Sequence, residues 1–262
     1  MSFVRLIYDY LSHQVQAVNE HGVHSPFLFK LLTESIYNKK SKSDYLPIEQ
    51  IRKSCLENET EIEVVDLGAG SRLDGKGKRR SIRFICKSFA KNRKLCRLLY
   101  QTVKHLRPLV TIELGTSLGI SSMYLAKGFN EGTVYTIEGC PNTSNLARLH
   151  FKQAGVENLV SVTGNFDDKL PALLKELGRF DCMYIDGNHT FEATTRYFDI
   201  LLPHIKNNSF VIFDDIHWSS DMTRAWEKII AHERVTMSVD FFYLGMVFFE
   251  PGFSKEHFRI RL

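Results

Sequence analysis

Five acidic side chains stand at the ends of apolar runs, where they could act on a bound ligand. They are Glu113, Glu138, Asp186, Asp214 and Asp215. Each apolar run is typical of a buried parallel strand, and the carboxyl ends of parallel strands meet at one edge of a sheet. Open α/β sheets bind their ligands at that edge. The acids therefore predict a cationic ligand or a metal ion there.

A glycine turn follows the first of these strands. It runs Glu113-Leu-Gly-Thr-Ser-Leu-Gly119, and its glycines, Gly115 and Gly119, permit positive φ and a close approach of the backbone to a ligand. Hydroxyl side chains gather where the next helix begins, which suits a bound carboxylate or phosphate. These hydroxyls belong to Thr116, Ser117, Ser121 and Ser122. Glu138 ends the next strand, where a carboxylate can accept ribose hydroxyls.

The glycine turn alone does not distinguish NAD from S-adenosylmethionine, and a tight turn without any ligand is a further alternative. A dinucleotide brings two phosphates, which the carboxylates of Glu113 and Asp186 would repel. S-adenosylmethionine carries an ammonium and a sulfonium and no phosphate. The acids therefore favour S-adenosylmethionine, and a dehydrogenase would instead prefer NAD.

Metal binding and proton transfer would depend on acids and histidines that follow the later strands. The carboxylates of Asp186, Asp214 and Asp215 suit Mg²⁺, although they could equally cap helices and hold the cofactor without metal. His189 follows Asp186 by three residues and is the expected general base, since histidine titrates near neutral pH. A histidine bonded to the backbone at a helix start is the alternative. His217 is a second candidate base.

The elements that position these residues alternate regularly from Leu109 onward. Expected strands are Val110–Leu114, Thr133–Glu138, Leu159–Thr163, Phe180–Ile185 and Ser209–Phe213. Expected helices are Ile120–Lys127, Asn142–Ala154, Lys169–Leu177, Phe191–Leu202 and Asp221–His232. The last β-rich segments, Val235–Asp240 and Tyr243–Phe249, predict an antiparallel hairpin. Together they predict an α/β, Rossmann-like fold with a mostly parallel, seven-stranded sheet.

Residues 1–108 are expected to form a helical extension, and residues 109–262 the cofactor-binding domain. Helices are expected over Phe3–Val18, from Pro26 to Tyr37 with Ser25 as the cap, and from Pro47. An extended segment begins at Glu61, and two helices precede Pro108.

A basic segment from Gly75 to Ile112 contains twelve Lys or Arg and no Asp or Glu. A solvated helical face, a cradle for an anionic substrate and a mobile lid all fit this pattern. We expect Ser71–Arg83 to be a loop over the active site. Its basic side chains, which could meet an anionic substrate, are Arg72, Lys76, Lys78, Arg79 and Arg80.

Composition limits the class of protein. The net charge of +4 is too mild to indicate nucleic acid by itself, and no NPPY or DPPY stretch occurs. No apolar run approaches the ~20 residues of a membrane span. Five cysteines without a CxxC pair suit reduced thiols in a cytoplasmic protein. A homodimer is compatible with this composition.

Two other glycine loops match known motifs only in part. Gly70–Gly77 approaches the phosphate-loop motif, but Gly77 replaces the Ser or Thr that binds Mg²⁺. Asp66-Leu-Gly-Ala-Gly70 imitates a cofactor loop but has no second acid before Glu113.

These motifs resemble those of class I S-adenosylmethionine-dependent methyltransferases, in particular the catechol-type, metal-assisted O-methyltransferases. The resemblance covers about Leu109 to Phe249. It rests on the loop after Glu113, on Glu138, on Phe180-Asp-Cys-Met-Tyr-Ile-Asp186-Gly-Asn-His189 and on Val211-Ile-Phe-Asp-Asp215. The N-terminal part, with His21-Gly-Val-His-Ser-Pro-Phe27 and Asp66–Ser71, is similar to uncharacterised methyltransferases of Bacteroidetes.

The resemblance implies roles for individual residues. Gly115, Ser117 and Ser122 would line the methionine part of the cofactor. Glu138 would hold the ribose, and Asn165 and Phe166 would contact the adenine. Asp186 would lie near the methionine amine and any metal. The cofactor site would comprise Glu113, Gly115, Thr116, Ser117, Gly119, Ser121, Ser122, Glu138, Gly139, Asn165, Phe166, Asp186 and His189. His189 stands where the catechol-type pattern has a lysine base. Asp215 replaces the usual Asn ligand of the metal.

The resulting hypothesis is methyl transfer from S-adenosylmethionine to a hydroxyl of a small molecule, with an anionic molecule as one option and Mg²⁺ as the second expected cofactor. His189 and Asp186 are the expected catalytic residues. The alternatives are a catalytically inactive protein that only binds S-adenosylmethionine, and a methyltransferase acting on nucleic acid or another anionic substrate.

Overall fold

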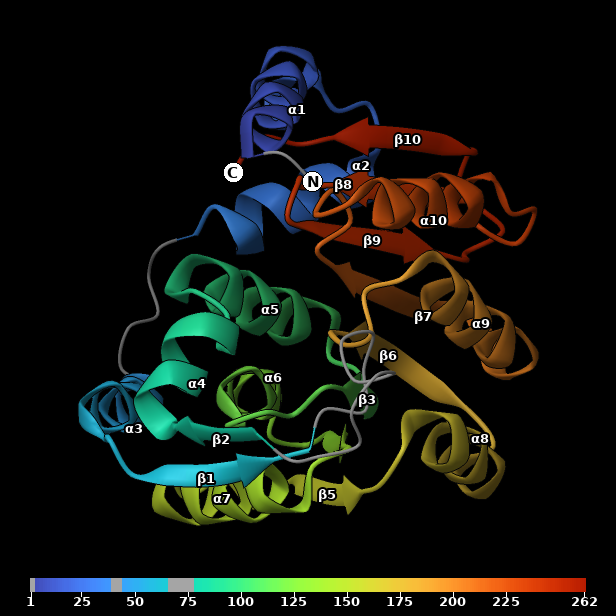
Figure 1. Ribbon diagram of the computed structural model, residues 1–262. Helices are drawn as coiled ribbons and strands as arrows, with labels where there is room; N and C mark the ends of the chain where they lie inside the picture. Colours follow the sequence, from blue (N-terminus) through green and yellow to red (C-terminus); the bar gives the residue numbers. More distant parts are fainter. Residues whose placement is uncertain (1–2, 39–43, 66–77) are drawn as a thin grey trace.

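The computed structural model describes residues 3–38, 44–65 and 78–262. The loops Asp66–Gly70 and Gly70–Gly77 therefore lie outside the described residues, as do Arg72 and Lys76 of the expected lid. A central sheet lies between two layers of helices, and α1 (Phe3–Gln16) lies at one end beside β10 (Figure 1). None of the described helices is long and apolar enough to cross a membrane.

The central sheet has eight strands in the order β10-β8-β9-β7-β6-β3-β4-β5. The strands are β3 (Val110–Leu114), β4 (Thr133–Glu138), β5 (Leu159–Thr163), β6 (Phe180–Ile185), β7 (Ile205–Asp214), β8 (Met237–Asp240), β9 (Leu244–Phe248) and β10 (Glu256–Arg259). Strand β9 is antiparallel to both of its neighbours, β7 and β8, and all other pairs are parallel. The expected α/β class, the mostly parallel sheet and the terminal hairpin are confirmed.

The expected number of seven strands is wrong by one, because β10 adds an eighth strand beside β8. Its residues are mostly charged or polar, and only Phe258 is buried. Such a segment lacks the apolar pattern that predicts a strand. A bridge between Val18 and Ile260 then joins the end of the chain to the segment after α1.

The order of the strands reverses at β3, which has β4 on one side and β6 on the other. The chain leaves β3 toward β4 and β5, then returns to build β6 and β7 on the opposite side. Ligands bind in the crevice that such a reversal opens at the carboxyl ends of the strands. The residues that follow β3 and β6 are therefore the ones that this topology brings to a site.

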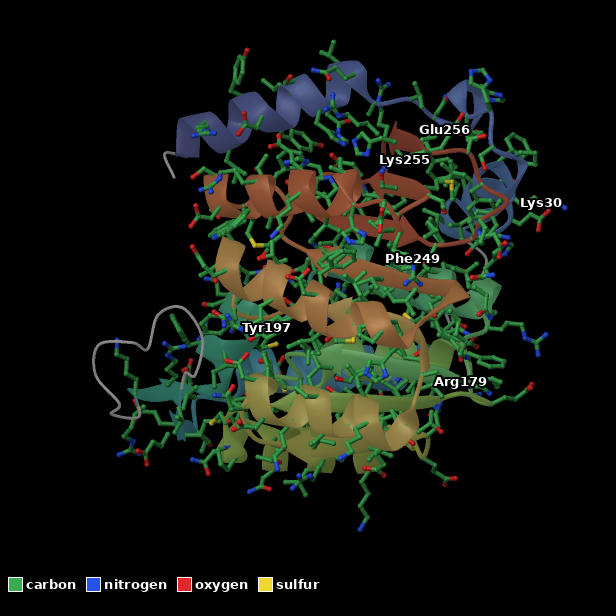
Figure 2. The ribbon with its side chains drawn as sticks, turned by 90° about the vertical axis from the view of Figure 1, so that its right-hand side faces the viewer. Lys30, Arg179, Tyr197, Phe249, Lys255 and Glu256 are labelled. Atoms are coloured by element: carbon green, nitrogen blue, oxygen red, sulfur yellow. The ribbon has the colours of Figure 1, made fainter. Side chains whose placement is uncertain are left out.

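One face of the sheet is covered by α8, α9 and α10, which lie side by side in Figure 2. Their bounds are Phe166–Leu177, Phe191–Leu201 and Ser220–Ala231. Their apolar side chains form one core with the strand residues Ile112, Met183 and Val211.

The opposite face carries the N-terminal helices together with α6 and α7. Their bounds are α2 (Pro26–Lys30), α3 (Leu46–Glu57), α4 (Ile82–Phe89), α5 (Arg93–Leu106), α6 (Ile120–Gly128) and α7 (Pro141–Gln153), and a π-helical turn at Leu31–Ile36 continues α2. Leu99 of α5 and Tyr124 of α6 share one core with Tyr184 and Ile212 of the sheet. The boundary at residue 108 stays a prediction, but the helices before it pack directly on the cofactor-binding half.

The described part of the expected lid, residues 78–83, forms a strand and the start of a helix instead of a loop. Lys78–Ser81 forms β2 and pairs antiparallel with β1 (Glu61–Val64), and α4 begins at Ile82. Arg79 lies 3.2 Å from the carboxylate of Glu61 in this ladder. Opposite charges on paired strands favour the ladder, which explains why a basic run forms a strand here.

Candidate active site

The glycine turn after β3 lies directly against the end of β6. Gly115 has φ of +99°, and a Cβ placed on it would lie 1.9 Å from the carbonyl oxygen of Asp186. Two backbone hydrogen bonds support this approach: Gly115 donates to Ile137, and Asp186 donates to Leu114. Gly119 has φ of +79°, and a Cβ there would meet the Phe151 ring at 2.3 Å. Both glycines are required by close packing as well as by backbone conformation.

Glu138, at the end of β4, holds the turn in shape. Its Oε2 accepts a hydrogen bond from the backbone N–H of Ser117 at 2.7 Å, and its Oε1 accepts one from Cys140 at 2.9 Å. Ser117 has φ of +48°, a conformation that non-glycine residues rarely adopt. Glu138 thus lies beside the turn, while its contact with ribose and the cofactor contact of Gly139 stay predictions.

Glu113 lies beneath the turn. It is fully buried, and one of its oxygens accepts hydrogen bonds from Ser122 and, at 2.6 Å, from Thr136. The Thr116 hydroxyl joins the same group at 2.6 Å from Thr136. Burial raises the pKa of Glu113 to about 7, although the bonds from Ser122 and Thr136 oppose the shift. In this structure Glu113 and Ser122 support the turn from below.

The expected adenine contacts lie at the start of α8. Asn165 caps this helix by accepting a hydrogen bond from the backbone N–H of Asp167. The Phe166 ring lies close to Gly187, where a Cβ would meet it at 2.7 Å, and contacts Tyr197 edge-on. Phe166 therefore lies beside the segment that carries Asp186, and its contact with adenine stays a prediction.

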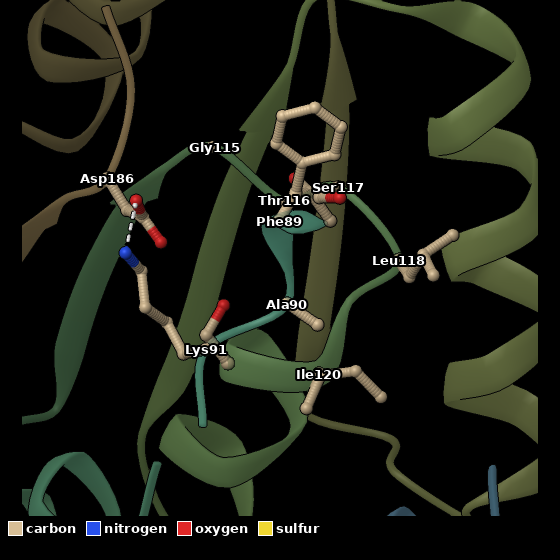
Figure 3. A pocket seen from close by; sticks show the side chains of 10 residues that line it. Phe89, Ala90, Lys91, Gly115, Thr116, Ser117, Leu118, Ile120 and Asp186 are labelled. Carbon is tan, nitrogen blue, oxygen red and sulfur yellow. Dashed lines mark ion pairs between the residues drawn. The ribbon is translucent and has the colours of Figure 1, made fainter. Parts of the chain in front are cut away.

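A recess opens beside the glycine turn (Figure 3), and the sequence analysis does not predict one of its walls. One wall is the turn itself with Asp186. The other is the connection between α4 and α5, which contributes Phe89, Ala90 and Lys91. The full lining is Phe89, Ala90, Lys91, Gly115, Thr116, Ser117, Leu118, Ile120, Ser121 and Asp186.

The three acids expected to bind metal do lie together, and Lys91 lies among them. Its ammonium nitrogen is 3.4 Å from Asp186 Oδ1 and 3.5 Å from Asp215 Oδ2, and it also donates to Asp214 Oδ2. The Lys91 side chain is only 13% exposed, and Asp214 is fully buried. The sequence does not indicate this role, because Lys91 is one of twelve basic residues in its segment.

The ion pairs shift the pKa values of the partners. Burial would lower the pKa of Lys91, but Asp186, Asp214 and Asp215 together raise it above its ordinary value. Burial opposes ionisation of Asp186 as well, yet Lys91 and His189 hold its pKa below the usual range. Burial and the nearby Asp186 raise the pKa of Asp214. Lys91 and Asp186 are therefore charged partners at neutral pH.

The backbone of Lys91 is fixed by residues of α3 and α5. Its carbonyl oxygen accepts a 2.7 Å hydrogen bond from Arg52 Nη1 and a weaker one from the Cys96 thiol. Arg52 is itself paired with Glu49 at 3.0 Å. Asn92 caps the start of α5 by accepting hydrogen bonds from the backbone N–H groups of Lys94 and Leu95. Lys91 thus stands on a rigid connection.

Of the two candidate bases, only His189 lies at this cluster. Its Nε2 is 3.5 Å from Asp186 Oδ1, and its side chain is 28% exposed. It lies on the connection between β6 and α9, where Thr190 caps the helix. The buried Tyr184 hydroxyl donates to the other oxygen of Asp186 at 3.1 Å.

The second candidate base, His217, belongs to a different group. Its Nε2 lies 2.8 Å from Asp240 Oδ2, and His13 of α1 lies 3.1 Å from the other oxygen of Asp240. His217 therefore connects the loop after β7 to α1 and β8.

The resemblance implies a divalent metal at these acids. Asp186, His189 and Asp214 each bring a ligand atom within 4.8 Å of the others, a spacing that suits a metal ion. However, Lys91 presents a positive charge to Asp186, Asp214 and Asp215 and already donates to Asp214. A divalent cation beside that ammonium would be repelled. With Lys91 in place, these residues do not fit a metal site.

The arrangement fits S-adenosylmethionine better than a dinucleotide. The recess is bordered by hydroxyls and by the carboxylate of Asp186 with its partner Lys91, and Glu138 adds a second carboxylate behind the turn. Strand reversal at β3, an antiparallel β9 between β7 and β8, and this glycine turn together define the class I methyltransferase fold. The chain has this fold.

Comparison with known proteins agrees with that assignment. Residues 112–216 match a family model described as a methyltransferase domain. A catechol O-methyltransferase of Mycobacterium tuberculosis is 31% identical over 107 residues, which cover 40% of this chain and 47% of that protein. The chain therefore matches less than half the length of this relative.

Solved structures share the fold. The O-methyltransferase from Bacillus cereus in complex with SAH superposes with a TM-score of 0.57 and 17% identity, covering 80% of this chain and 92% of that one. The O-methyltransferase TomG from Streptomyces achromogenes, which is involved in tomaymycin synthesis, gives a TM-score of 0.54 and 20% identity, with 62% and 82% covered.

Proposed function

We propose that this chain transfers the methyl group of S-adenosylmethionine to a hydroxyl oxygen of a small molecule. The observation that carries the proposal is the recess in which Asp186, Lys91 and the glycine turn meet, with His189 beside Asp186. Bound S-adenosylmethionine would supply a methyl group activated by the sulfonium. The turn from Gly115 to Ser121 would hold its methionine part, and Glu138 its ribose.

The acceptor hydroxyl must lose its proton as the new O–CH₃ bond forms. Because His189 turns Nε2 toward Asp186, its Nδ1 is the nitrogen assigned to accept that proton. Asp186 would orient the ring and stabilise the imidazolium. The electron pair of the broken C–S bond stays on sulfur, so the sulfonium becomes a neutral thioether.

Mg²⁺ is not part of this proposal, because the ammonium of Lys91 already pairs with the three acids expected to bind it. An anionic acceptor is supported by Arg80, whose guanidinium lies 5.2 Å from the centre of the Phe89 ring at the recess. The acceptor class is therefore a small hydroxylated molecule that carries a carboxylate or a similar group.

The test is release of S-adenosylhomocysteine with a panel of hydroxylated acceptors that includes phenolic acids. His189→Ala is expected to lower kcat by roughly 100-fold or more, as for loss of a general base. The control is His21→Ala, because the side chain of His21 is 81% exposed and pairs only weakly with Glu20. A protein that merely binds the cofactor would bind S-adenosylhomocysteine yet show no turnover with any acceptor. That result would contradict the proposed function.

A further inference from the structure

The carboxylates at the ends of β6 and β7 share one buried cation that is part of the chain. Lys91 contacts Asp186, Asp214 and Asp215, which come from two neighbouring strand ends. Unpaired buried charges would destabilise the fold, and here the three acids share the positive charge of Lys91. The ammonium therefore neutralises part of a cluster that would otherwise attract an external cation.

We propose that the Lys91 ammonium is the resident cation of this site and takes the place of a divalent metal. We also infer that the same ammonium binds the acceptor oxygen, and only this second part of the inference rests on the proposed function. An ammonium has three N–H donors in rotatable positions. One donor directed at the acceptor oxygen would orient it and stabilise the negative charge that develops as the proton leaves.

The connection that carries Lys91 is built to keep it in place. Arg52 and Cys96 both donate to its carbonyl oxygen, and Asn92 fixes the first turn of α5 directly after it. Arg52 is 7% exposed and paired with Glu49, so this anchor is itself buried. A side chain held at its backbone in this way remains close to the carboxylates, where its charge competes with any metal ion.

Asp215 is consistent with this assignment. It stands where the resemblance implies an Asn ligand, and it faces Lys91 at 3.5 Å. A carboxylate at this position gives the Lys91 ammonium a third negatively charged partner, which a neutral Asn would not provide.

The experiment is a titration of the metal-stripped full chain with Mn²⁺, followed by electron paramagnetic resonance of the free ion. Lys91→Met leaves the three carboxylates without the ammonium, and it is expected to bind Mn²⁺ at least about 100-fold more tightly than the natural protein. Lys91→Arg keeps the charge and is expected to behave as the natural protein does. The matched control is Lys87→Met, since Lys87 is an exposed residue of the preceding helix.

Tight Mn²⁺ binding by the natural protein that is lost in Asp214→Asn would overturn the inference, and this measurement does not require the Lys91→Met protein to fold. If Lys91→Met destabilises the chain, Lys91→Met combined with Asp215→Asn removes one unpaired charge and is expected to gain the same Mn²⁺ site. Failure of both folded variants to gain Mn²⁺ binding would also overturn it. None of these titrations involves methyl transfer, so their failure is distinguishable from failure of the proposed function.

Discussion

Arg52 donates a 2.7 Å hydrogen bond from Nη1 to the carbonyl oxygen of Lys91, 39 residues further along the chain. The bond connects α3 to the wall of the recess that carries Lys91. An N-terminal helix thus helps to position a residue of the candidate active site.

Removing this anchor should weaken both the fold and the site. Arg52→Met leaves the Glu49 carboxylate with one partner fewer and frees the Lys91 carbonyl. We expect a loss of about 3 kcal/mol in the free energy of unfolding, measured by urea denaturation, since a buried ion pair is broken. Lys53→Met, at a neighbouring side chain that is 74% exposed, should change it by less than about 0.5 kcal/mol. Equal effects of the two substitutions would contradict the anchoring role.

Two glycines with positive φ should respond differently to alanine. Gly115→Ala places a Cβ 1.9 Å from the Asp186 carbonyl oxygen, so the turn and the end of β6 must separate. We expect the affinity for S-adenosylhomocysteine, measured by calorimetry, to fall about 100-fold, equivalent to roughly 3 kcal/mol. Gly155 also has positive φ, but a Cβ there meets nothing within 4 Å. Gly155→Ala should cost only about 1 kcal/mol of stability and leave binding intact.

Glu113 should make stability depend on pH. Its pKa is about 7 in the folded protein and 4.5 in a model compound, so the folded state binds the additional proton between these values. Stability should therefore fall as pH rises from 4.5 to above 7, by about 3 kcal/mol in the absence of cofactor. Glu113→Gln should abolish this decrease in the free energy of unfolding, measured by denaturation from pH 4 to 8. The exposed Glu157→Gln is the control, and a slope unchanged by Glu113→Gln would exclude this explanation.

Asp240 should hold α1 to the sheet. Its oxygens contact His13 and His217, and the backbone N–H of Phe242 donates to it at 2.7 Å. Burial opposes ionisation, but these partners hold the pKa of Asp240 below the ordinary value of 3.8. The stabilisation that ionised Asp240 gives to the folded state is thus present at neutral pH and is lost only as pH falls below about 3.8.

The corresponding variant is Asp240→Asn, which should cost about 3 kcal/mol and expose α1 to limited proteolysis. Asp221→Asn removes only an exposed contact with Arg224 and should leave the cleavage rate unchanged. Faster cleavage elsewhere in the chain, with α1 protected, would argue against this role.

Arg80 should select the acceptor without taking part in the reaction. Arg80→Gln is expected to raise KM for a carboxylated acceptor about 10-fold at unchanged kcat, since a binding contact near Phe89 is lost. Arg79 is the matched control, because neighbouring residues of a strand point to opposite faces and Arg79 pairs with Glu61. An equal rise in KM in Arg79→Gln would indicate a general effect of charge.

Most of the sheet and the cofactor turn were determined by local sequence. Strands β3, β4, β5 and β6 begin and end where the sequence predicts them, and β6, which is buried along its whole length, is the most apolar of them. Gly115 marks the turn because its conformation and packing exclude a side chain. The meeting of Asp186, Asp214 and Asp215 follows from parallel strands, whose ends lie on one edge.

The partners of those acids were decided only by tertiary structure. Lys91 is distant in sequence from Asp186, and it reaches the cluster because α4 and α5 pack on the sheet and turn at that point. Nothing in a run of basic residues distinguishes the one lysine that will be buried, since burial depends on which helix faces the sheet. The same holds for β10, whose charged residues form a strand only because β8 offers an unpaired edge. The sequence places the acids at the site, and the packing of α4 and α5 on the sheet brings Lys91 to them.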